Sequence, residues 1–247
     1  MTLPLISVVM PVSRDIDVTL ESLSRILSQP NVNLEIILVY VKPGLEVKQR
    51  LLTLFPNAVI KETYHLVMGN PHTTRCRGMP LATGEFIHLM DDDDLLPEDW
   101  YSQLNYNVDI NWSMVSIVKV DGKLSTLRAP ACYAKSNVSG TVYRASVISK
   151  VFDAIPADMP SFISPYMYMM VAYHLCSPEY HVLDEGIIRV RCAEWYPWKD
   201  ITIRNKQPRH TQFWKGFLDM GIPTTGIFHL DNYFKHYGKG VGPWRNL

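Results

Sequence analysis

The chain has 247 residues, of which 47% are hydrophobic and 19% charged, and its formal net charge is zero. This composition supports a sizeable buried core, and the sequence shows no repeats or low-complexity segments. No apolar run approaches the ~20 residues of a membrane-spanning helix, so we expect no transmembrane segment. The four cysteines follow no metal-binding pattern, and residues 1–4 lack the basic start of a secretory signal. We therefore expect a cytoplasmic protein with reduced thiols.

Strand and helix patterns alternate through the first 90 residues. Compact apolar runs predict strands at 5–10, 34–41, 58–60 and 85–90, and helical spacing of apolar residues predicts helices at 15–27, 45–55 and 73–81. Near-continuous apolar strands are typical of a parallel sheet that is buried on both faces. We therefore expect an α/β fold with a mostly parallel central sheet and helices on both of its faces.

The pattern changes in the second half of the chain. It predicts a helix at 97–106, a hairpin of 112–120 and 123–128 around Asp121-Gly122, a strand at 137–143, helices at 145–152 and 164–175, and one bent or two short strands at 180–190. The remainder is aromatic, basic and irregular, with one helix expected near 211–220. We therefore expect one domain over 1–190 and a C-terminal extension over 191–247.

Four consecutive aspartates, Asp91 to Asp94, directly follow the apolar run 85–90. Adjacent carboxylates repel one another, and a divalent cation is the usual compensator. Ligands of open α/β sheets bind just beyond the carboxyl ends of the strands, where this run is expected to lie. The position favours Mg²⁺ or Mn²⁺, held by carboxylate oxygens and shared with a substrate phosphate. The alternative is a solvated acidic turn that caps a helix starting near Pro97.

Several segments form a recognisable series along the chain: residues 6–13, Ile-Ser-Val-Val-Met-Pro-Val-Ser, residues 74–78 and 82–87, the four aspartates, and residues 139–144. Taken in order, they resemble family 2 glycosyltransferases with the GT-A fold. Residues 6–13 look like the family's opening strand and loop. Residues 74–78 and 82–87 resemble its Arg-Asn-x-Gly and Ala-x-Gly-Glu-Tyr-Ile segments, and the aspartates lie where the family has its Asp-x-Asp motif. Residues 139–144 resemble the strand and turn before the acceptor-side helix. The resemblance implies a nucleotide-binding half over about 1–95 and an acceptor half over about 96–190. Because the extension is basic and aromatic, we expect it to fold over the donor as a lid.

The resemblance also implies roles for individual residues. Asp93 or Asp94 would bind Mn²⁺ or Mg²⁺, and Asp91 or Asp92 would face the ribose. The metal would neutralise the charge that develops on the nucleoside diphosphate leaving group. The other donor-site candidates are two arginines near the diphosphate and four residues bordering the nucleoside, namely Arg75, Arg77, Pro11, Val12, Ser13 and Tyr40. Structural roles stay open for them, such as a surface arginine, a helix cap at Ser13 or a core tyrosine at Tyr40.

The sequence departs from the family pattern at four places. The second strand ends in Val39-Tyr40-Val41-Lys42, without the Asp residues that usually read the base, and Cys76 replaces the Asn of the arginine motif. The Glu-Asp pair that supplies the general base of inverting members is replaced by Ser164-Pro165. Asp158 is our first candidate for a base, while a retaining mechanism would need none. The usual Arg-x-His segment appears as residues 189–192 without the His.

We therefore expect a metal-dependent glycosyltransferase that uses a nucleotide sugar, with a UDP-sugar as the leading donor. The acceptor stays open among a saccharide, a lipid-linked glycan, a protein and a modified nucleic-acid base. Residues 199–247 hold eight basic and three acidic residues, a net charge of +5, which suits an anionic acceptor or a solvated face. The alternatives are a nucleotidyltransferase and a catalytically silent module that binds nucleotide sugars.

Overall fold

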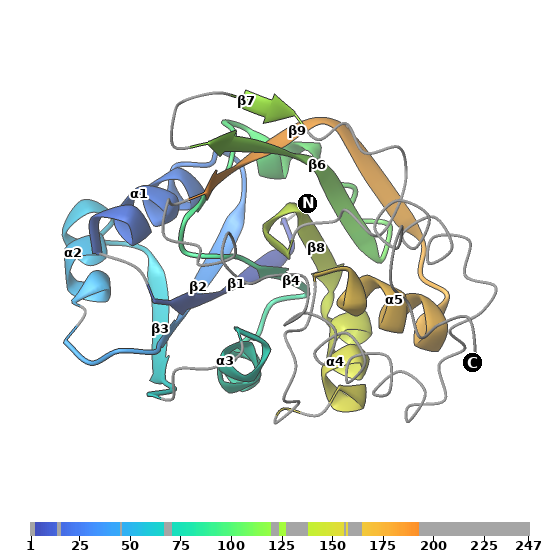
Figure 1. The fold of residues 1–247 in the computed structure, drawn as a ribbon, viewed down its shortest axis with the longest axis horizontal. Coiled ribbons are helices and arrows are strands. Elements are labelled where there is room, and N and C mark those ends of the chain that lie inside the picture. The colour runs from blue at the N-terminus through green and yellow to red at the C-terminus, as the bar shows by residue number, and fades with distance from the viewer. Residues whose placement is uncertain are drawn as a thin grey trace, which may run out of the picture.

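The computed structural model describes residues 3–13, 16–44, 46–66, 71–119, 124–126, 138–155, 157 and 165–192. Within these residues nine strands form one sheet in the order β3-β2-β1-β4-β8-β6-β9-β5, with β7 paired to β6 (Figure 1). The strands are β1 (Leu5–Val12), β2 (Asn33–Tyr40), β3 (Val59–Tyr64), β4 (Phe86–Leu89), β5 (Asp94–Leu95), β6 (Ile110–Lys119), β7 (Leu124–Thr126), β8 (Thr141–Arg144) and β9 (Tyr180–Cys192).

The first half of the sheet is parallel and the second half is mixed. Strands β3, β2, β1 and β4 run parallel to one another, whereas β8 runs antiparallel to both β4 and β6. Strand β6 therefore points the same way as β4, and β9 pairs with it in parallel. The carboxyl ends of β1, β2, β3 and β4 consequently meet at one edge of the sheet, which we call the carboxyl edge.

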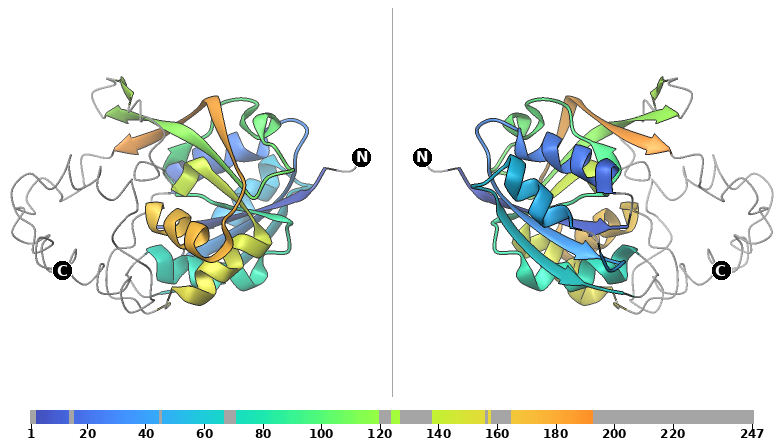
Figure 2. Two further views of the ribbon diagram at one scale, coloured as in Figure 1. Left: turned by 90° about the vertical axis from the view of Figure 1, so that its right-hand side faces the viewer. Right: turned by 90° about the vertical axis from the view of Figure 1, so that its left-hand side faces the viewer.

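Helices cover both faces of the sheet, as the sequence predicted. Helices α1 (Ile16–Leu27) and α2 (Val47–Leu54) lie on one face, and α3 (Pro71–Gly78), α4 (Ala145–Ala154) and α5 (Pro165–Cys176) lie on the other (Figures 1 and 2). Side chains along β1 alternate between the two cores, because successive residues of a strand point to opposite faces. Val8 and Met10 pack in the core under α1 and α2, and Val9 packs in the core under α4 and α5.

The C-terminal glycine of α3 lets this helix lie close against the sheet. A Cβ at Gly78 would lie 2.7 Å from methyl groups of Val9 and Val39. Both valines are fully buried, so neither has free space into which to move. The glycine of the family-like arginine motif is therefore explained by packing of α3 on β1 and β2.

Most of the predicted elements that fall within the described residues are confirmed, and the differences have physical causes. The helix predicted at 97–106 is wrong, because only a short 3-10 helix forms at Trp100–Gln103. Asp99 before it has a left-handed backbone, and Trp100 and Tyr101 are buried in the core, so tertiary packing overrides the helical pattern. Strand β3 runs to Tyr64 because it pairs with β2 over six residues. Residues 180–192 form one continuous strand.

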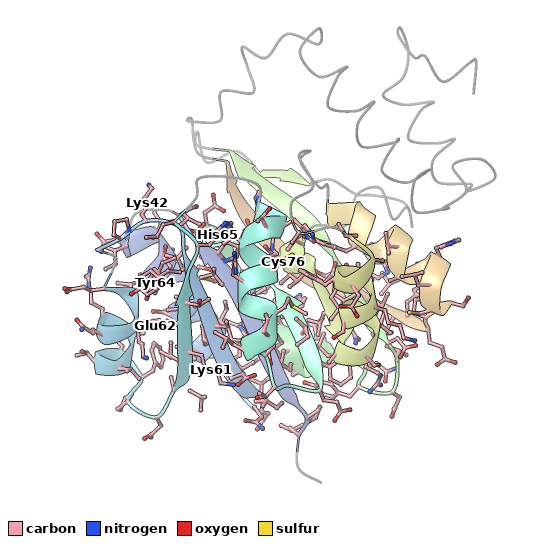
Figure 3. All side chains as sticks on the ribbon, turned by 90° about the horizontal axis from the view of Figure 1, so that it is seen from below. Lys42, Lys61, Glu62, Tyr64, His65 and Cys76 are labelled. Carbon is pink, nitrogen blue, oxygen red and sulfur yellow. The ribbon has the colours of Figure 1, made fainter. Side chains whose placement is uncertain are left out.

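A buried polar network closes the amino edge of the sheet, opposite the carboxyl edge. The carboxylate of Glu35 is 2% exposed and lies 2.6 Å from Nζ of Lys61 on β3, which Figure 3 places toward the end of that strand remote from His65. It also accepts hydrogen bonds from the Ser7 hydroxyl and from the Thr83 backbone. Burial alone would raise the pKa of Glu35, but Lys61 and these hydrogen bonds outweigh it and hold the pKa below its usual range.

Candidate functional site

The acidic run forms a tight turn at the carboxyl edge, directly after β4. The backbone N–H of Asp94 donates to the carbonyl of Asp91, and Asp94 then begins β5, which pairs with β9. The hydroxyl of Ser22 on α1 donates to the Asp94 carbonyl at 2.6 Å. Asp92, Asp93 and Asp94 are 4%, 9% and 1% exposed, whereas the Asp91 side chain is 39% exposed. The turn is thus held on a strand and a helix, with Asp91 facing solvent most openly.

Asp92 joins the acidic turn to the end of β1. Its Oδ2 accepts the backbone N–H of Ser13 at 2.6 Å and lies 3.4 Å from the Ser13 hydroxyl. The sequence predicted that Ser13 and the acidic run border one ligand, and the structure brings the two residues into direct contact. A hydrogen bond to the charged carboxylate stabilises its ionised form. In the ligand-free protein Asp92 therefore holds the acidic turn against the end of β1.

Asp91 forms an ion pair with Arg75, one of the two arginines predicted to lie near the diphosphate. Arg75 lies on α3 and its side chain is only 4% exposed, so it is not a surface arginine. Burial would lower its pKa, but Asp91 and the hydroxyl of Tyr168 outweigh burial and raise the pKa of Arg75 above its usual value. A buried, permanently charged guanidinium therefore lies beside the acidic turn.

Tyr168 of α5 supports Arg75 from the other side. A guanidinium only donates hydrogen bonds, so the Tyr168 hydroxyl accepts from Arg75 and has its own proton free for Nδ1 of His72, 2.9 Å away. The Tyr168 ring stacks on Phe152 of α4 at 5.4 Å. Burial raises the pKa of Tyr168 to about 12, so the phenol stays protonated at neutral pH. Sequence analysis predicted this helix at 164–175 and did not connect it to this site.

A second buried histidine supports the backbone of the acidic turn. The Asp91 N–H donates to the Ser139 hydroxyl at 3.0 Å, and the Ser139 carbonyl lies 2.8 Å from Nε2 of His88 on β4. A carbonyl only accepts, so Nε2 carries the proton and Nδ1 accepts from the Tyr101 hydroxyl at 2.7 Å. Full burial lowers the pKa of His88 to about 4, which keeps the ring neutral. The only sequence signal for this group was a histidine inside an apolar strand.

The oxygen ligands of the acidic turn suit a hard divalent cation that also coordinates a substrate. The acidic turn presents carboxylate oxygens, the ligands that Mg²⁺ and Mn²⁺ prefer. Within the described part of the chain, no three His, Cys, Asp or Glu side chains are arranged to hold a metal ion. A cation bound here would therefore use one or two of the carboxylates and take its other ligands from phosphate and water.

The other residues that the sequence predicted to bind the nucleotide-sugar donor lie in different environments. Pro11 and Val12 are buried at the end of β1, and Tyr40 is 1% exposed, with its ring stacked on Tyr64 at 5.2 Å. The Tyr40 ring thus lies in the core, one of the two roles that the sequence left open, and Tyr64 is the exposed ring of the pair at 54%. Arg77 is exposed.

Residues near the end of β3 add polar groups that the sequence analysis did not consider. His65 follows β3, and its backbone N–H donates to the carbonyl of Tyr40 at 2.8 Å. Burial and the nearby charge of Arg77 lower the pKa of His65. Figure 3 shows Lys42 and His65 at the end of β2 and β3 that is remote from Lys61. The carboxyl edge thus combines acidic groups at β4 with basic groups at α3 and beyond β2.

Asp158, our candidate general base, lies outside the described residues, as do residues 193–247 of the extension. Among the other acids near that segment of the sequence, Glu179 lies directly before β9. Its carbonyl accepts the backbone N–H groups of Asp109 and Ile110 at the start of β6. This is the end of the sheet remote from the acidic turn, so Glu179 is not placed to act there.

The architecture matches solved structures of TarS from S. aureus, a GT-A-type glycosyltransferase. The alignment with the structure of TarS residues 1–349 covers 95% of this chain and 73% of the TarS chain, at a TM-score of 0.64 and 14% sequence identity. The same region in complex with UDP gives a TM-score of 0.63 at 15% identity, covering 97% and 76% of the two chains. The complex with UDP-GlcNAc gives 0.62 at 14% identity, covering 94% and 71%.

These likenesses show that the chain has the α/β fold of a GT-A-type glycosyltransferase. The chain spans 44% of the longer solved TarS chain. No protein-family model and no curated protein matches the sequence. Among the described residues, none of the helices has the length and apolar character needed to cross a membrane.

Proposed function

We propose that this protein is a metal-dependent glycosyltransferase that takes its sugar from a UDP-sugar donor. The observation that carries the proposal is the acidic turn, which follows β4 at the carboxyl edge and has the buried Arg75 beside it. Carboxylates and a fixed guanidinium together suit a diphosphate bridged by a cation. The fold supports the proposal further, because TarS of this fold has been solved in complex with UDP and with UDP-GlcNAc.

Each group at the site has a proposed task. Asp93 or Asp94 would hold Mn²⁺ or Mg²⁺, and Asp91 or Asp92 would border the ribose. The cation supplies charge neutralisation at the leaving diphosphate when it is bound. Arg75 orients the diphosphate by hydrogen bonds, and Ser13 borders the nucleoside. The basic and aromatic extension over residues 191–247 is proposed to cover the donor and shape the acceptor site.

The decisive experiment is calorimetric titration of UDP in the presence of Mn²⁺ and, separately, of excess EDTA. We expect binding with Mn²⁺ and a loss of affinity of at least about 10-fold with EDTA, since the cation bridges carboxylate and phosphate. Equal affinity in the two conditions would exclude metal-dependent binding. A panel of nucleotide sugars, assayed for slow release of the nucleoside diphosphate with Mn²⁺, then identifies the donor. Binding without release from any donor would favour a catalytically silent module.

A further inference from the structure

Arg75 has two partners among the described residues, and they differ in kind. Asp91 provides a negative charge on the solvent side, and Tyr168 provides a neutral hydroxyl on the buried side. No acceptor within the described residues lies at Nε of Arg75, which is buried. The guanidinium therefore has hydrogen-bonding capacity beyond its present partners, and its single anionic partner there is Asp91.

Removing Asp91 from Arg75 without a replacement is unfavourable. A buried charge that loses its partner destabilises a protein strongly, because the low-dielectric interior cannot solvate it. A cation that binds the Asp91 carboxylate has this effect, since it draws the shared negative charge away from the guanidinium. The diphosphate of a sugar donor relieves this destabilisation of Arg75, because phosphate oxygens are strong hydrogen-bond acceptors for arginine.

Resting on the function proposed above, with Asp92 as the residue that borders the ribose, we propose that Asp91 is a second carboxylate for the cation beside Asp93 or Asp94. Arg75 then competes with the divalent cation for Asp91 and thereby couples cation binding to diphosphate binding. In the ligand-free protein Arg75 occupies Asp91 and weakens the site for a cation alone. When cation and diphosphate arrive together, the diphosphate replaces Asp91 as the partner of Arg75. Tyr168 and His72 are positioning residues that keep the guanidinium in place during this exchange of partners.

The test is the variant Arg75→Gln, studied with Mn²⁺ alone and with UDP at saturating Mn²⁺. Mn²⁺ affinity is measured without nucleotide from the paramagnetic resonance signal of the free ion. We expect Mn²⁺ alone to bind about 10-fold tighter in the variant, and UDP with Mn²⁺ to bind about 10-fold weaker, so that the coupling between the two ligands falls. Unchanged or weaker binding of Mn²⁺ alone would overturn the proposal.

Two controls distinguish the effect of the Arg75–Asp91 ion pair from an effect of net charge on Mn²⁺ binding. Arg77→Gln removes the same charge from the same helix at an exposed position, and we expect it to change the affinity for Mn²⁺ alone by less than about 2-fold. In an Asp91→Asn background, Arg75→Gln should change this affinity by less than about 2-fold, because the competing pair is already absent. An equal gain in Arg77→Gln, or a full gain in the Asp91→Asn background, would show that only net charge matters.

The variant Tyr168→Phe tests whether Tyr168 positions Arg75. It also tests the competition for Asp91 if Arg75→Gln does not fold. It keeps the ring that stacks on Phe152 and removes the hydroxyl, without any change of charge. Arg75 then depends on Asp91 alone, so we expect Mn²⁺ alone to bind about 3-fold weaker. Equal or tighter binding would overturn the proposal. If the wild-type protein binds UDP with Mn²⁺ but the variants fail these tests, the proposed function stands and only the competition is wrong; if it binds neither ligand, both fail.

Discussion

The backbone N–H of Ser13 donates a hydrogen bond of 2.6 Å to Oδ2 of Asp92, although 79 positions separate the two residues along the chain. This contact joins the end of β1 to the turn after β4, which are neighbouring strands of the sheet. The Asp92 carboxylate therefore helps to hold the acidic turn against the end of β1. The first prediction concerns Asp93, one of the two residues proposed to hold the metal ion.

We predict that Asp93→Asn lowers release of UDP from a UDP-sugar donor at least ~100-fold, because a lost metal ligand removes several kcal/mol of leaving-group stabilisation. The control is Asp17→Asn on α1, whose exposed carboxylate pairs with Arg50, and it should leave the rate unchanged. Thermal melting should show both variants folded. Wild-type activity of Asp93→Asn with Mn²⁺ still bound would show that this carboxylate is structural.

Glu35 provides a prediction about stability. Its pKa is lowered in the folded protein, so its ionised form stabilises the fold above the unfolded pKa of about 4.3, and this contribution is lost as pH falls through the folded pKa. We expect Glu35→Gln to reduce the free energy of unfolding by about 2 kcal/mol at pH 7. The difference from wild type should shrink below about pH 4.

Urea unfolding at the two pH values measures this effect, and β3 offers a matched control. Glu62 also pairs with a lysine, Lys48, but at 3.8 Å and with both side chains about one-third exposed. Exposed pairs contribute little, so Glu62→Gln should change the free energy of unfolding by less than about 0.5 kcal/mol. Equal effects of the two substitutions would contradict our assignment of Glu35 to a buried network.

The buried His88 gives the stability of the protein a second dependence on pH. Its pKa is depressed to about 4 in the folded protein, whereas an unfolded histidine titrates near 6.5, so the unfolded state gains the proton first as pH falls. Stability should therefore decrease between about pH 6.5 and pH 4, by on the order of 3 kcal/mol from this group. His88→Gln should flatten the profile in this window. A slope as steep in the variant as in wild type would assign the pH dependence to other residues.

Gly78→Ala tests the packing of α3 against the sheet. The added methyl group would lie 2.7 Å from side-chain atoms of Val9 and Val39, and we expect a loss of about 1–3 kcal/mol in the free energy of unfolding. Gly78→Ala combined with Val39→Ala should recover part of this loss relative to the sum of the single changes, because the second substitution makes room for the methyl group. Strict additivity of the two changes would argue against the contact.

The parallel half of the fold was predictable from sequence because its signals are local. Apolar runs predicted β1, β2 and β4, and the helical periodicity of 15–27 predicted α1, which the structure gives as Ile16–Leu27. The acidic turn was predictable as well, since its position follows from the strand before it. The helix predicted at 97–106 failed because burial of Trp100 and Tyr101, which depends on distant residues, decides the conformation there.

The supporting contacts of the site could not be predicted, because they join residues that are far apart in sequence. His88 meets Ser139 across 51 positions, and His72 meets Tyr168 across 96. No periodicity reports such pairs. The resemblance to glycosyltransferases indicated Arg75, but the burial that makes its charge dependent on Asp91 is visible only once α3, α5 and β4 are assembled.

The two charged clusters of the parallel sheet lie at opposite ends of the same strands. The Glu35 network includes Ser7 near the start of β1, while Ser13 beyond its end contacts the acidic turn, roughly 20 Å away at ~3.3 Å per residue. Substitutions at one end therefore have little direct influence on the other. A change of residue in the acidic turn therefore leaves in place the Glu35 network, which joins β1, β2 and β3 at the amino edge.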